Sequence, residues 1–344
     1  MRIAYAIHGI GPPLLVSTCW LSHLQYDWES PVWRHFLADL GRFATVIRFD
    51  ERGHGLSDWD VTDHSLTARV GDLEAVADDA GFDSFALMAM SQGGPVAIAY
   101  AAAHPERVTR LVFWGSYSAA EQGLTVEELE VEDTFGQMIK VGWARPESTF
   151  RRVFTSLMIP GATEEQMRWL DELQRVSVSA TTAYLSRKQR MVSSADELLP
   201  QLTAPTLVLH SLRDQMNDFH YGRHLASSIA GARLVPLDSD NHILLEDEPA
   251  WAVFVQELQE FLAADQEAPH QDSRVAGGSV ATLSARELEV LQLAANGLDN
   301  DAIATRLTLS VRTVERHLQN AYVKLDVQGR TARAAAVARL LTSS

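Results

Sequence analysis

The residue best suited to nucleophilic chemistry is a serine on a predicted strand-to-helix turn. Ser91 lies between an apolar run that ends at Ala89 and an alanine-rich helix predicted from Pro95. A serine on such a sharp turn needs small residues two places before and two places after it, and Ala89 and Gly93 supply them. The Gln92 amide would then face the negative charge that develops on an attacked carbonyl. Turns of small residues after strands are common, so the motif alone is also consistent with an ordinary turn.

Two further residues with suitable chemistry follow later predicted strands. Asp214 comes shortly after the apolar run Thr206–His210, and His242 follows the run Ala232–Leu237. The carboxyl ends of parallel strands meet at one edge of a sheet, which is where such folds bind ligands. The order serine, aspartate, histidine along the chain is the order found in α/β-hydrolases.

Strands and helices alternate in the part of the chain that must position these residues. Apolar runs predict strands at Leu14–Val16, Ala44–Phe49, Phe85–Ala89 and Val108–Trp114, with helices between the later ones, and Met1–Tyr5 also predicts a strand. This alternation is typical of a doubly wound, mainly parallel sheet.

Residues 1–265 resemble the α/β-hydrolases in the loop Asp50–Ser57, in the turn at Ser91 and in the turn at Asn241-His242. The resemblance implies an α/β fold with a sheet core at 1–118 and 201–265 and a helical lid at 119–200. It implies that Ser91 is a nucleophile, His242 its general base and Asp214 the residue that orients the base.

The same resemblance implies an oxyanion hole formed by two backbone amides. The first donor is the Gln92 amide, and the second comes from the loop after the first central strand, near Cys19 or Trp20. In that loop the family often has His-Gly, whereas this chain has Ser17-Thr18. Cys19 has no paired base in the sequence, so we expect a small buried residue or an oxyanion-loop residue rather than a nucleophile.

Residues 119–200 break the alternation and predict helices throughout, with many aromatic and methionine side chains. Trp143, Phe154 and Met158 belong to this group. One interpretation is that they pack the lid onto the core, and the other is that several of them face an apolar ligand cavity. His23, close to Trp20 in the sequence, is a further candidate for the wall of that cavity.

The last 60 or so residues predict four short amphipathic helices with tight joints. Ser284 and Glu287 form a predicted capping box, and Asp299 and Ser310 are predicted caps of the next two helices. The third helix places apolar residues on one side and basic and amide side chains on the other, which suits contacts to base edges and phosphates. A solvated helix face is the alternative interpretation. The expected DNA-contacting residues are Ser310, Arg312, Thr313, Arg316, Gln319, Asn320 and Lys324.

Residues 280–344 resemble the LuxR-type DNA-binding domain, a four-helix helix-turn-helix domain. Matching segments include Leu283–Glu287, Leu309-Ser310, Thr313-Val314 and His317-Leu318. The chain departs from the family at residues 299–302, where a serine-capped turn is more usual, and at Glu315, where many members carry a cation or an amide. The resemblance implies binding to double-stranded DNA, as a homodimer on paired half-sites.

Composition agrees with two parts joined by a linker. From Val280 onward the chain has eight basic and six acidic residues, whereas the whole chain has a net charge of −16, so residues 1–279 carry −18. An acidic body with a mildly basic end suits a protein that meets DNA only through that end. Residues 266–279, polar and rich in glycine and alanine, are the predicted linker.

Other features of the sequence exclude several classes of protein. A single cysteine, Cys19, excludes an intrachain disulfide, and no run of 18 apolar residues predicts a membrane span. We therefore expect a soluble, cytoplasmic protein that does not contact a membrane. No cysteine and histidine cluster has zinc spacing and no glycine-rich loop has the lysine of a phosphate cradle, so we expect neither metal nor cofactor.

Two functions remain open from the sequence. The first is a transcriptional regulator whose hydrolase-like body senses, and in some cases hydrolyses, a small apolar ester- or lactone-like molecule. The second is a serine hydrolase of the esterase or lactonase type with an appended DNA-binding domain. We favour the regulator because the terminal helices bear directly on DNA binding, whereas a fold alone does not establish turnover. A body used only for dimerisation is a third hypothesis.

Overall fold

The computed structural model of the chain describes residues 1–17, 19–120, 125–147, 149–264, 283, 285–295, 298–307, 309–325, 327 and 332–342. The chain forms two compact units, one built mainly from residues 1–265 and the other mainly from residues 266–344. We call the described parts of these units the body (residues 1–264) and the tail (residues 283–342). The predicted linker at 266–279 and the capping residue Ser284 lie outside the described residues.

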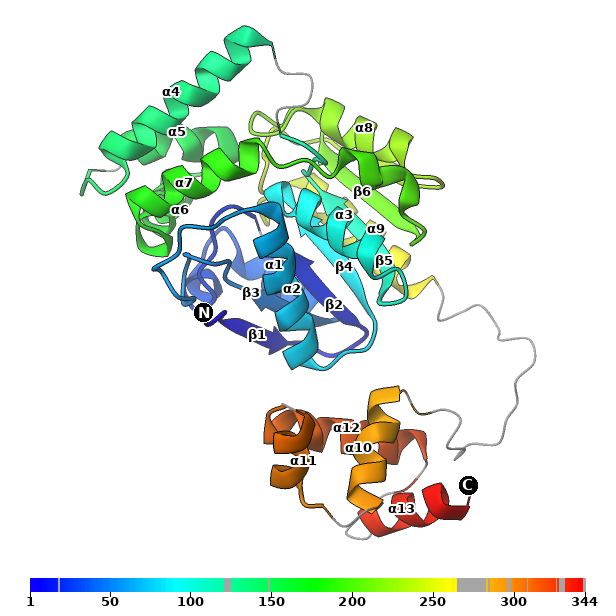
Figure 1. Ribbon diagram of the computed structural model, residues 1–344. Coiled ribbons are helices and arrows are strands. Elements are labelled where there is room, and N and C mark those ends of the chain that lie inside the picture. Colours follow the sequence, from blue (N-terminus) through cyan, green and yellow to red (C-terminus); the bar gives the residue numbers. More distant parts are fainter. Residues whose placement is uncertain are drawn as a thin grey trace. The chain divides into compact units, whose positions relative to one another are not determined.

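A seven-stranded sheet forms the centre of the body, in the order β1-β3-β2-β4-β5-β6-β7 (Figure 1). Only β1 runs antiparallel to its neighbour, β3, and all other pairs are parallel. The central strand β4 is buried along its whole length, as expected for a strand covered by helices on both faces. The predicted doubly wound, mainly parallel sheet is therefore confirmed. The strands are β1 Tyr5–His8, β2 Pro13–Ser17, β3 Thr45–Phe49, β4 Phe85–Met90, β5 Val108–Trp114, β6 Thr206–Ser211 and β7 Arg233–Leu237.

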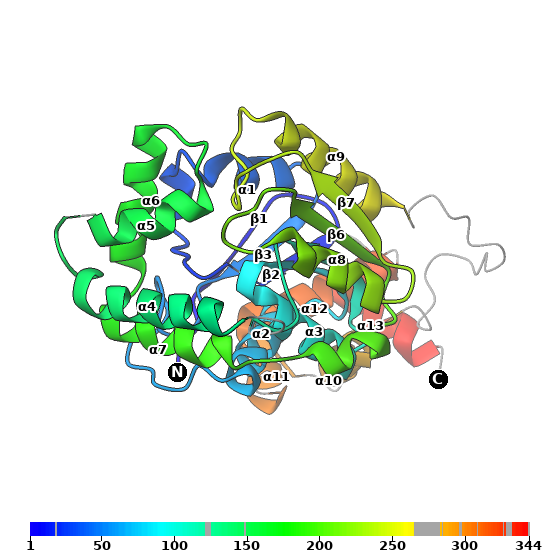
Figure 2. The same cartoon turned by 90° about the horizontal axis from the view of Figure 1, so that it is seen from above.

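Helices cover both faces of this sheet. In Figure 2, α1 and α9 lie on one face, and α2, α3 and α8 lie on the other. The core between these layers is apolar, with leucine, valine, phenylalanine and tryptophan side chains from the strands and from α1 and α9. These helices are α1 Arg34–Leu40, α2 Leu66–Ala80, α3 Gly94–Ala103, α8 Phe219–Ser228 and α9 Pro249–Ala263, with short 3-10 helices at Tyr26–Glu29, Ser91–Gly93 and Asp196–Gln201.

The first strand begins later than the sequence predicts. The prediction was Met1–Tyr5, but β1 starts at Tyr5. The backbone before it makes other hydrogen bonds, because the Arg2 amide donates to the Asp58 carboxylate and the Ala4 amide donates to the Ser57 hydroxyl. These contacts tie the start of the chain to the loop after β3, and the strand begins four residues later than predicted.

Four helices between β5 and β6 form a lid at one end of the body. They are α4 Val126–Gly142, α5 Thr149–Met158, α6 Glu164–Ser177 and α7 Ala180–Met191, and Figures 1 and 2 show them grouped together. A complete capping box at Thr163 and Gln166 fixes the start of α6, and Ser179 caps α7.

The tail is a separate bundle of four helices, α10 Ala285–Ala295, α11 Asn300–Leu307, α12 Val311–Lys324 and α13 Ala332–Thr342. The predicted caps of α11 and α12 are present, because the Asp299 carboxylate accepts from the Ala302 amide at 2.8 Å and the Ser310 hydroxyl accepts from the Thr313 amide at 3.1 Å. Val290, Leu291 and Val314 lie at the centre of the small apolar core. Among the described residues, every helix is too short or too polar to cross a membrane.

Candidate functional site

Ser91 lies on a strained turn between β4 and α3. Its φ is +48°, and it is the only residue other than glycine with a positive φ in the described part of the chain. Such a conformation costs about 1–3 kcal/mol and persists only where the surrounding structure enforces it. Tight packing enforces it here, because a Cβ on Gly93 would lie 2.5 Å from the Ser17 carbonyl oxygen and one on Gly94 would lie 2.0 Å from that of Tyr117.

Asp214 and His242 form a buried pair next to this turn. The Nδ1 atom of His242 lies 2.7 Å from Oδ2 of Asp214. The other carboxylate oxygen of Asp214 accepts from the backbone amides of Met216 and Asn217 at 2.8 and 2.9 Å. The carboxylate is therefore fixed by the loop after β6, and it in turn fixes the orientation of the imidazole ring. This is the arrangement that the sequence predicts for a base and its orienting residue.

The Ser91 hydroxyl has a partner that the sequence did not indicate. The side-chain amide of Asn217 donates to Ser91 Oγ at 3.2 Å and to the Gly115 carbonyl oxygen at 2.7 Å. The described residues show no hydrogen bond between Ser91 Oγ and His242. Such bonds are often long in a site without ligand and shorten when substrate binds.

A cavity of about 50 Å³ brings these groups together. That volume accommodates only a few atoms the size of a water molecule, so a ligand larger than a short acyl group requires lid side chains to move. Ser91, Gln92 and His242 line it, as do Cys19 and Trp20 from the loop after β2. The remaining lining residues are Tyr117, Met158, Arg187, Arg190, Met191, Met216 and Asn217.

The structure separates the predicted cavity residues into two groups. Met158 lines the cavity, whereas Trp143 and Phe154 are buried behind Trp20, with ring centroids 5.3 and 5.5 Å from its ring. These two aromatic residues therefore pack the lid onto the core and are absent from the described wall of the cavity. His23 is also absent from that wall, because its Nδ1 accepts from the Tyr26 amide and its ring packs against the Tyr26 ring.

Burial raises the pKa of the Cys19 thiol to about 11. A thiol with that pKa stays protonated near neutral pH, and a protonated thiol is a poor nucleophile. Cys19 therefore borders the cavity as a small apolar residue.

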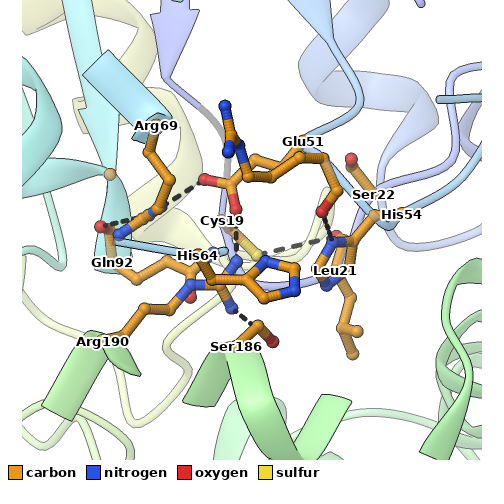
Figure 3. Close-up of polar contacts among 12 residues, drawn as sticks. Cys19, Leu21, Ser22, Glu51, His54, His64, Arg69, Gln92, Ser186 and Arg190 are labelled. Carbon is orange, nitrogen blue, oxygen red and sulfur yellow. Dashed lines mark hydrogen bonds and ion pairs between the residues drawn. The ribbon is translucent and has the colours of Figure 1, made fainter. Parts of the chain in front are cut away.

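A buried network of charged groups lies against the same cavity (Figure 3). The Glu51 carboxylate, from the loop after β3, pairs with Arg69 of α2 at 2.9 Å and with Arg190 of the lid helix α7. Arg69 also donates to the Gln92 carbonyl oxygen at 3.1 Å, which links the network to the turn at Ser91. Burial alone would raise the pKa of Glu51, but Arg190 and Arg69 lower it to about 2, so the carboxylate is ionised.

Two histidines complete this network in a neutral form. Burial, reinforced by the charge of Arg190, lowers the pKa of His54 to about 3 and that of His64 to about 4. The His64 amide donates to the side chain of Gln189 on α7 at 2.6 Å. The loop after β3 therefore supports the lid helix through both neutral and charged contacts.

In the tail, α12 has one buried and one exposed side. Val314, Leu318 and Leu325 pack into the tail core, while Arg312 and Gln319 are exposed. Glu315 is exposed on the same helix, Ser310 is exposed at its start, and Asn320 is half-buried. Arg316 lies on α12, but its side chain is outside the described residues.

Three of the predicted DNA-contacting residues, Ser310, Thr313 and Lys324, make contacts within the tail. The Thr313 side chain is buried, and its hydroxyl lies 2.7 Å from that of Ser310. The Lys324 ammonium lies 2.7 Å from the buried carboxylate of Glu287 on α10. Both contacts hold α12 in place, so the exposed side chains of Arg312 and Gln319 are the freer donors on this helix.

Sequence reasoning missed the residues that reach the site from distant segments. Asn217 lies three residues after Asp214 in a loop, and its polar character alone did not identify it. Arg187 and Arg190 are three residues apart on α7, which is the spacing of neighbours on one face of a helix. That spacing was a usable signal, although it does not tell which part of the core the face contacts.

Comparisons with known proteins match the body and the tail to two different families. Residues 12–249 match the family model for the alpha/beta hydrolase fold, and residues 281–337 match that for the luxR family of bacterial regulatory proteins. The putative carbamate hydrolase RutD of Azorhizobium caulinodans is 26% identical over 242 residues, which cover 69% of this chain and 87% of that protein. The nitrate/nitrite response regulator protein NarP of Escherichia coli is 34% identical over 99 residues, which cover 28% of this chain and 44% of that protein.

Solved structures give the same result for the body. An esterase from Exiguobacterium antarcticum superposes with a TM-score of 0.61 at 21% sequence identity, covering 77% of this chain and 96% of that chain. At this identity the likeness establishes the fold of the body and leaves its chemistry to the site.

Proposed function

The chain belongs to the α/β-hydrolase fold family through residues 12–249 and carries a LuxR-type DNA-binding domain at residues 281–337, and from this premise we propose that it is a transcriptional regulator whose body senses a small ester- or lactone-like molecule at Ser91. The observation that carries this proposal is the strained Ser91 turn beside the Asp214–His242 pair, at a cavity lined in part by the helices between β5 and β6. A pocket of this kind on a DNA-binding chain suits recognition of a carbonyl compound.

The same groups support hydrolysis as the second candidate function. His242 would take the proton of the Ser91 hydroxyl as the hydroxyl attacks a carbonyl carbon, and Asp214 would stabilise the resulting imidazolium. The backbone amides of Gln92 and of Cys19 or Trp20 would donate hydrogen bonds to the developing oxyanion. The His242 imidazolium would give its proton to the leaving alkoxide, so that the alcohol departs and the acyl group stays on Ser91 Oγ. Neutral His242 would then take a proton from water as the water attacks the acyl carbon, and would return it to Ser91 Oγ as the carboxylic acid leaves. In this scheme the regulator also destroys its ligand.

Ester hydrolysis tests the second candidate. If the site turns over, we expect Ser91→Ala to lower kcat by roughly 10³–10⁶. Thr305→Ala, an exposed substitution in the tail, serves as the matched control and should leave kcat unchanged. Equal slow rates in wild type and Ser91→Ala would limit the body to sensing.

Retention of promoter DNA in a gel tests the regulator. Replacing both Arg312 and Arg316 by alanine removes two cations of α12, and we expect operator affinity to fall by about tenfold or more. Unchanged retention by this double variant would contradict DNA binding through α12.

Three finer features belong to the same proposal. The protein acts as a homodimer, because readers of this type bind paired half-sites about 34 Å apart. It acts in the cytoplasm, where bacterial promoters are found. A compound that enters beneath the lid changes operator affinity. Size measurements at micromolar concentration that show only monomer, with and without operator, would contradict the first of these.

A further inference from the structure

We propose that the ligand of the body carries a carboxylate, which Arg190 binds together with the side-chain N–H groups of Trp20 and Gln92. This inference rests on the proposed function for the location of the site, beside Ser91. It adds a chemical class to the ligand, an anion with a short carbon chain.

The first support is a set of unused hydrogen-bond donors around one cavity. Trp20 Nε1, Gln92 Nε2 and Arg190 Nε are buried and have no hydrogen-bond partner among the described residues. All three residues line the cavity that contains Ser91, and they are 6%, 4% and 3% exposed. Arg187, which lines it too, has a fourth such atom, its Nε.

These atoms share one chemical property, because every one of them is a donor and none can accept. Buried donors without partners lower the stability of the folded chain, because they lose their hydrogen bonds to water. A ligand in this cavity that presents several acceptor lone pairs would offer partners to them. A carboxylate has about four such lone pairs and no donor.

The second support is an excess of positive charge behind the cavity wall. Glu51 is the one carboxylate between Arg69 and Arg190, so this buried network carries a net charge of about +1. The nearby cations have their own partners, since Arg52 pairs with Asp72 at 2.6 Å and Arg187 pairs with Glu132. His54 and His64 are neutral, as their lowered pKa values show.

No acidic residue is present among the described residues that line the cavity. The Asp214 carboxylate lies behind His242, and it is held by that ring and by the Met216 and Asn217 amides, whereas the ion pairs of Arg69 and Arg190 are with Glu51. A buried charge without a counterion is strongly unfavourable. An anionic ligand next to Arg190 would supply the missing charge, whereas a neutral ester or a water molecule would satisfy only the hydrogen bonds. The charge excess therefore favours a carboxylate over a neutral group.

A second cavity in the body provides a comparison. It is lined by Asp27, Arg48 and Trp33 among others, and it also has buried polar atoms without partners. There the unused atoms include an acceptor, Asp27 Oδ1, beside two donors, and Asp27 and Arg48 form an ion pair at 3.3 Å. Such a mixture suits ordered water. Of these two cavities, the one at Ser91 has unused donors without an unused acceptor among its described lining residues, and it lies against the network with excess positive charge.

The test uses two esters of the same size. Monomethyl succinate carries a carboxylate where methyl levulinate carries a neutral methyl ketone. Calorimetry on full-length Ser91→Ala measures binding without turnover, and wild-type hydrolysis is measured in parallel. We expect Ser91→Ala to bind monomethyl succinate at least tenfold more tightly than methyl levulinate.

Variants in the same background assign this preference to the proposed donors. Arg190→Gln should remove most of the preference, and Trp20→Phe, which keeps the ring and loses only the N–H, should reduce it by about threefold without disturbing the ion pairs. Arg52→Gln is the matched control, because Arg52 also pairs with a buried carboxylate but does not line the cavity, and it should leave the preference unchanged.

The outcomes separate this inference from the proposed function. Equal affinity for the two esters, or a preference unaffected by both Arg190→Gln and Trp20→Phe, overturns the carboxylate, and hydrolysis of both esters would still leave a working Ser91 site. A clear preference for monomethyl succinate without hydrolysis of either ester supports the carboxylate-binding inference and excludes hydrolysis as the function of the site. Tighter binding of inorganic phosphate than of monomethyl succinate, or no binding of either ester at 10 mM, also overturns the inference.

Discussion

The hydroxyl of Ser91 already forms a hydrogen bond with Asn217, and for catalysis it must also form one with His242. Asn217 already donates to Ser91 Oγ, and its backbone amide holds the Asp214 carboxylate that orients His242. Asn217 is therefore a positioning residue for all three groups. A donor on the serine oxygen also occupies a lone pair, which leaves the hydroxyl proton free to point toward His242.

Replacing Asn217 by alanine should lower kcat for ester hydrolysis by about tenfold, because the serine then loses one of the bonds that fix its rotamer. KM should change by less than a factor of two. Asn217→Asp supplies an acceptor in place of the donor and should be worse than alanine at neutral pH. A steady-state comparison of the three proteins checks this, and an alanine variant with unchanged kcat would contradict the positioning role.

The buried histidines predict how the stability of the body depends on pH. The pKa of His54 is about 3 in the folded chain, against 6.5 for an ordinary histidine. As the pH falls below 6.5 the unfolded chain binds a proton that the folded chain does not. The stabilisation from neutral His54 is therefore present above pH 6.5 and is lost as the pH falls toward 3.

Substituting His54 by glutamine should remove the proton that the unfolded chain binds at position 54 and the folded chain does not. Between pH 5 and 6.5 the free energy of unfolding of the body should then depend on pH less steeply, by up to about 1.4 kcal/mol per pH unit. Urea titrations followed by tryptophan fluorescence measure it. His220→Gln, at the exposed start of α8, is the control, and an equal slope in all three proteins would contradict a neutral buried His54.

At the scale of elements, α12 separates residues that hold the helix from residues that are free to meet DNA. Lys324 joins α12 to the buried Glu287 of α10, whereas Arg312 is exposed at the beginning of the helix. Both cations lie on one helix, but among the described residues of the tail an ion pair is seen for Lys324 and not for Arg312.

Alanine substitutions at these two positions should therefore affect different properties, the stability of the tail at Lys324 and operator binding at Arg312. Lys324→Ala removes a partner of a buried carboxylate and should destabilise the tail by about 1–2 kcal/mol, detected as faster hydrogen exchange in α12. Arg312→Ala should leave exchange unchanged and weaken operator binding, with the salt dependence reduced by about one ion if the contact is to phosphate. Equal effects of both variants on DNA binding alone would contradict this division.

The elements themselves were predictable where the signal is local. The apolar run of β4 and the caps at Asp299 and Ser310 are determined by neighbouring residues, and the structure contains all three. The lid was predicted as helical, but its pattern of aromatic residues did not distinguish the cavity wall from the layer behind it. Trp143 and Phe154 lie in that layer because Trp20 separates them from Ser91.

The polar half of the candidate site was less accessible from the sequence. Arg190 meets Glu51 across 139 positions of the chain, and neither residue belongs to a motif. Only the packing of α7 on the loop after β3 brings them together, and that packing depends on the whole lid. The catalytic candidates could be predicted because the strands of a parallel sheet end at a common edge. No comparable rule predicts from the sequence that Glu51 and Arg190 lie side by side.

At the scale of the whole molecule, the two units can be observed separately with the natural chain. All eight tryptophans lie at or before Trp251, so their fluorescence reports on the body alone. DNA binding is reported by the tail. Ligand binding and operator binding can therefore be measured on one sample, which is what a test of coupling between the units requires.

If the body regulates the tail, the two binding events must be coupled equally in both directions. A ligand that changes operator affinity by some factor requires the operator to change ligand affinity by the same factor, because both equal one coupling free energy. For a coupling of about 1–3 kcal/mol this factor is roughly 5–150.

The Ser91→Ala variant, which prevents turnover, allows both factors to be measured. We expect operator duplex to change the affinity for monomethyl succinate by the same factor by which monomethyl succinate changes the affinity for operator duplex. Arg190→Gln should abolish the coupling in both, and Arg52→Gln should preserve it. Identical ligand affinity with and without operator, in a protein that binds both, would mean that the body and the tail act independently.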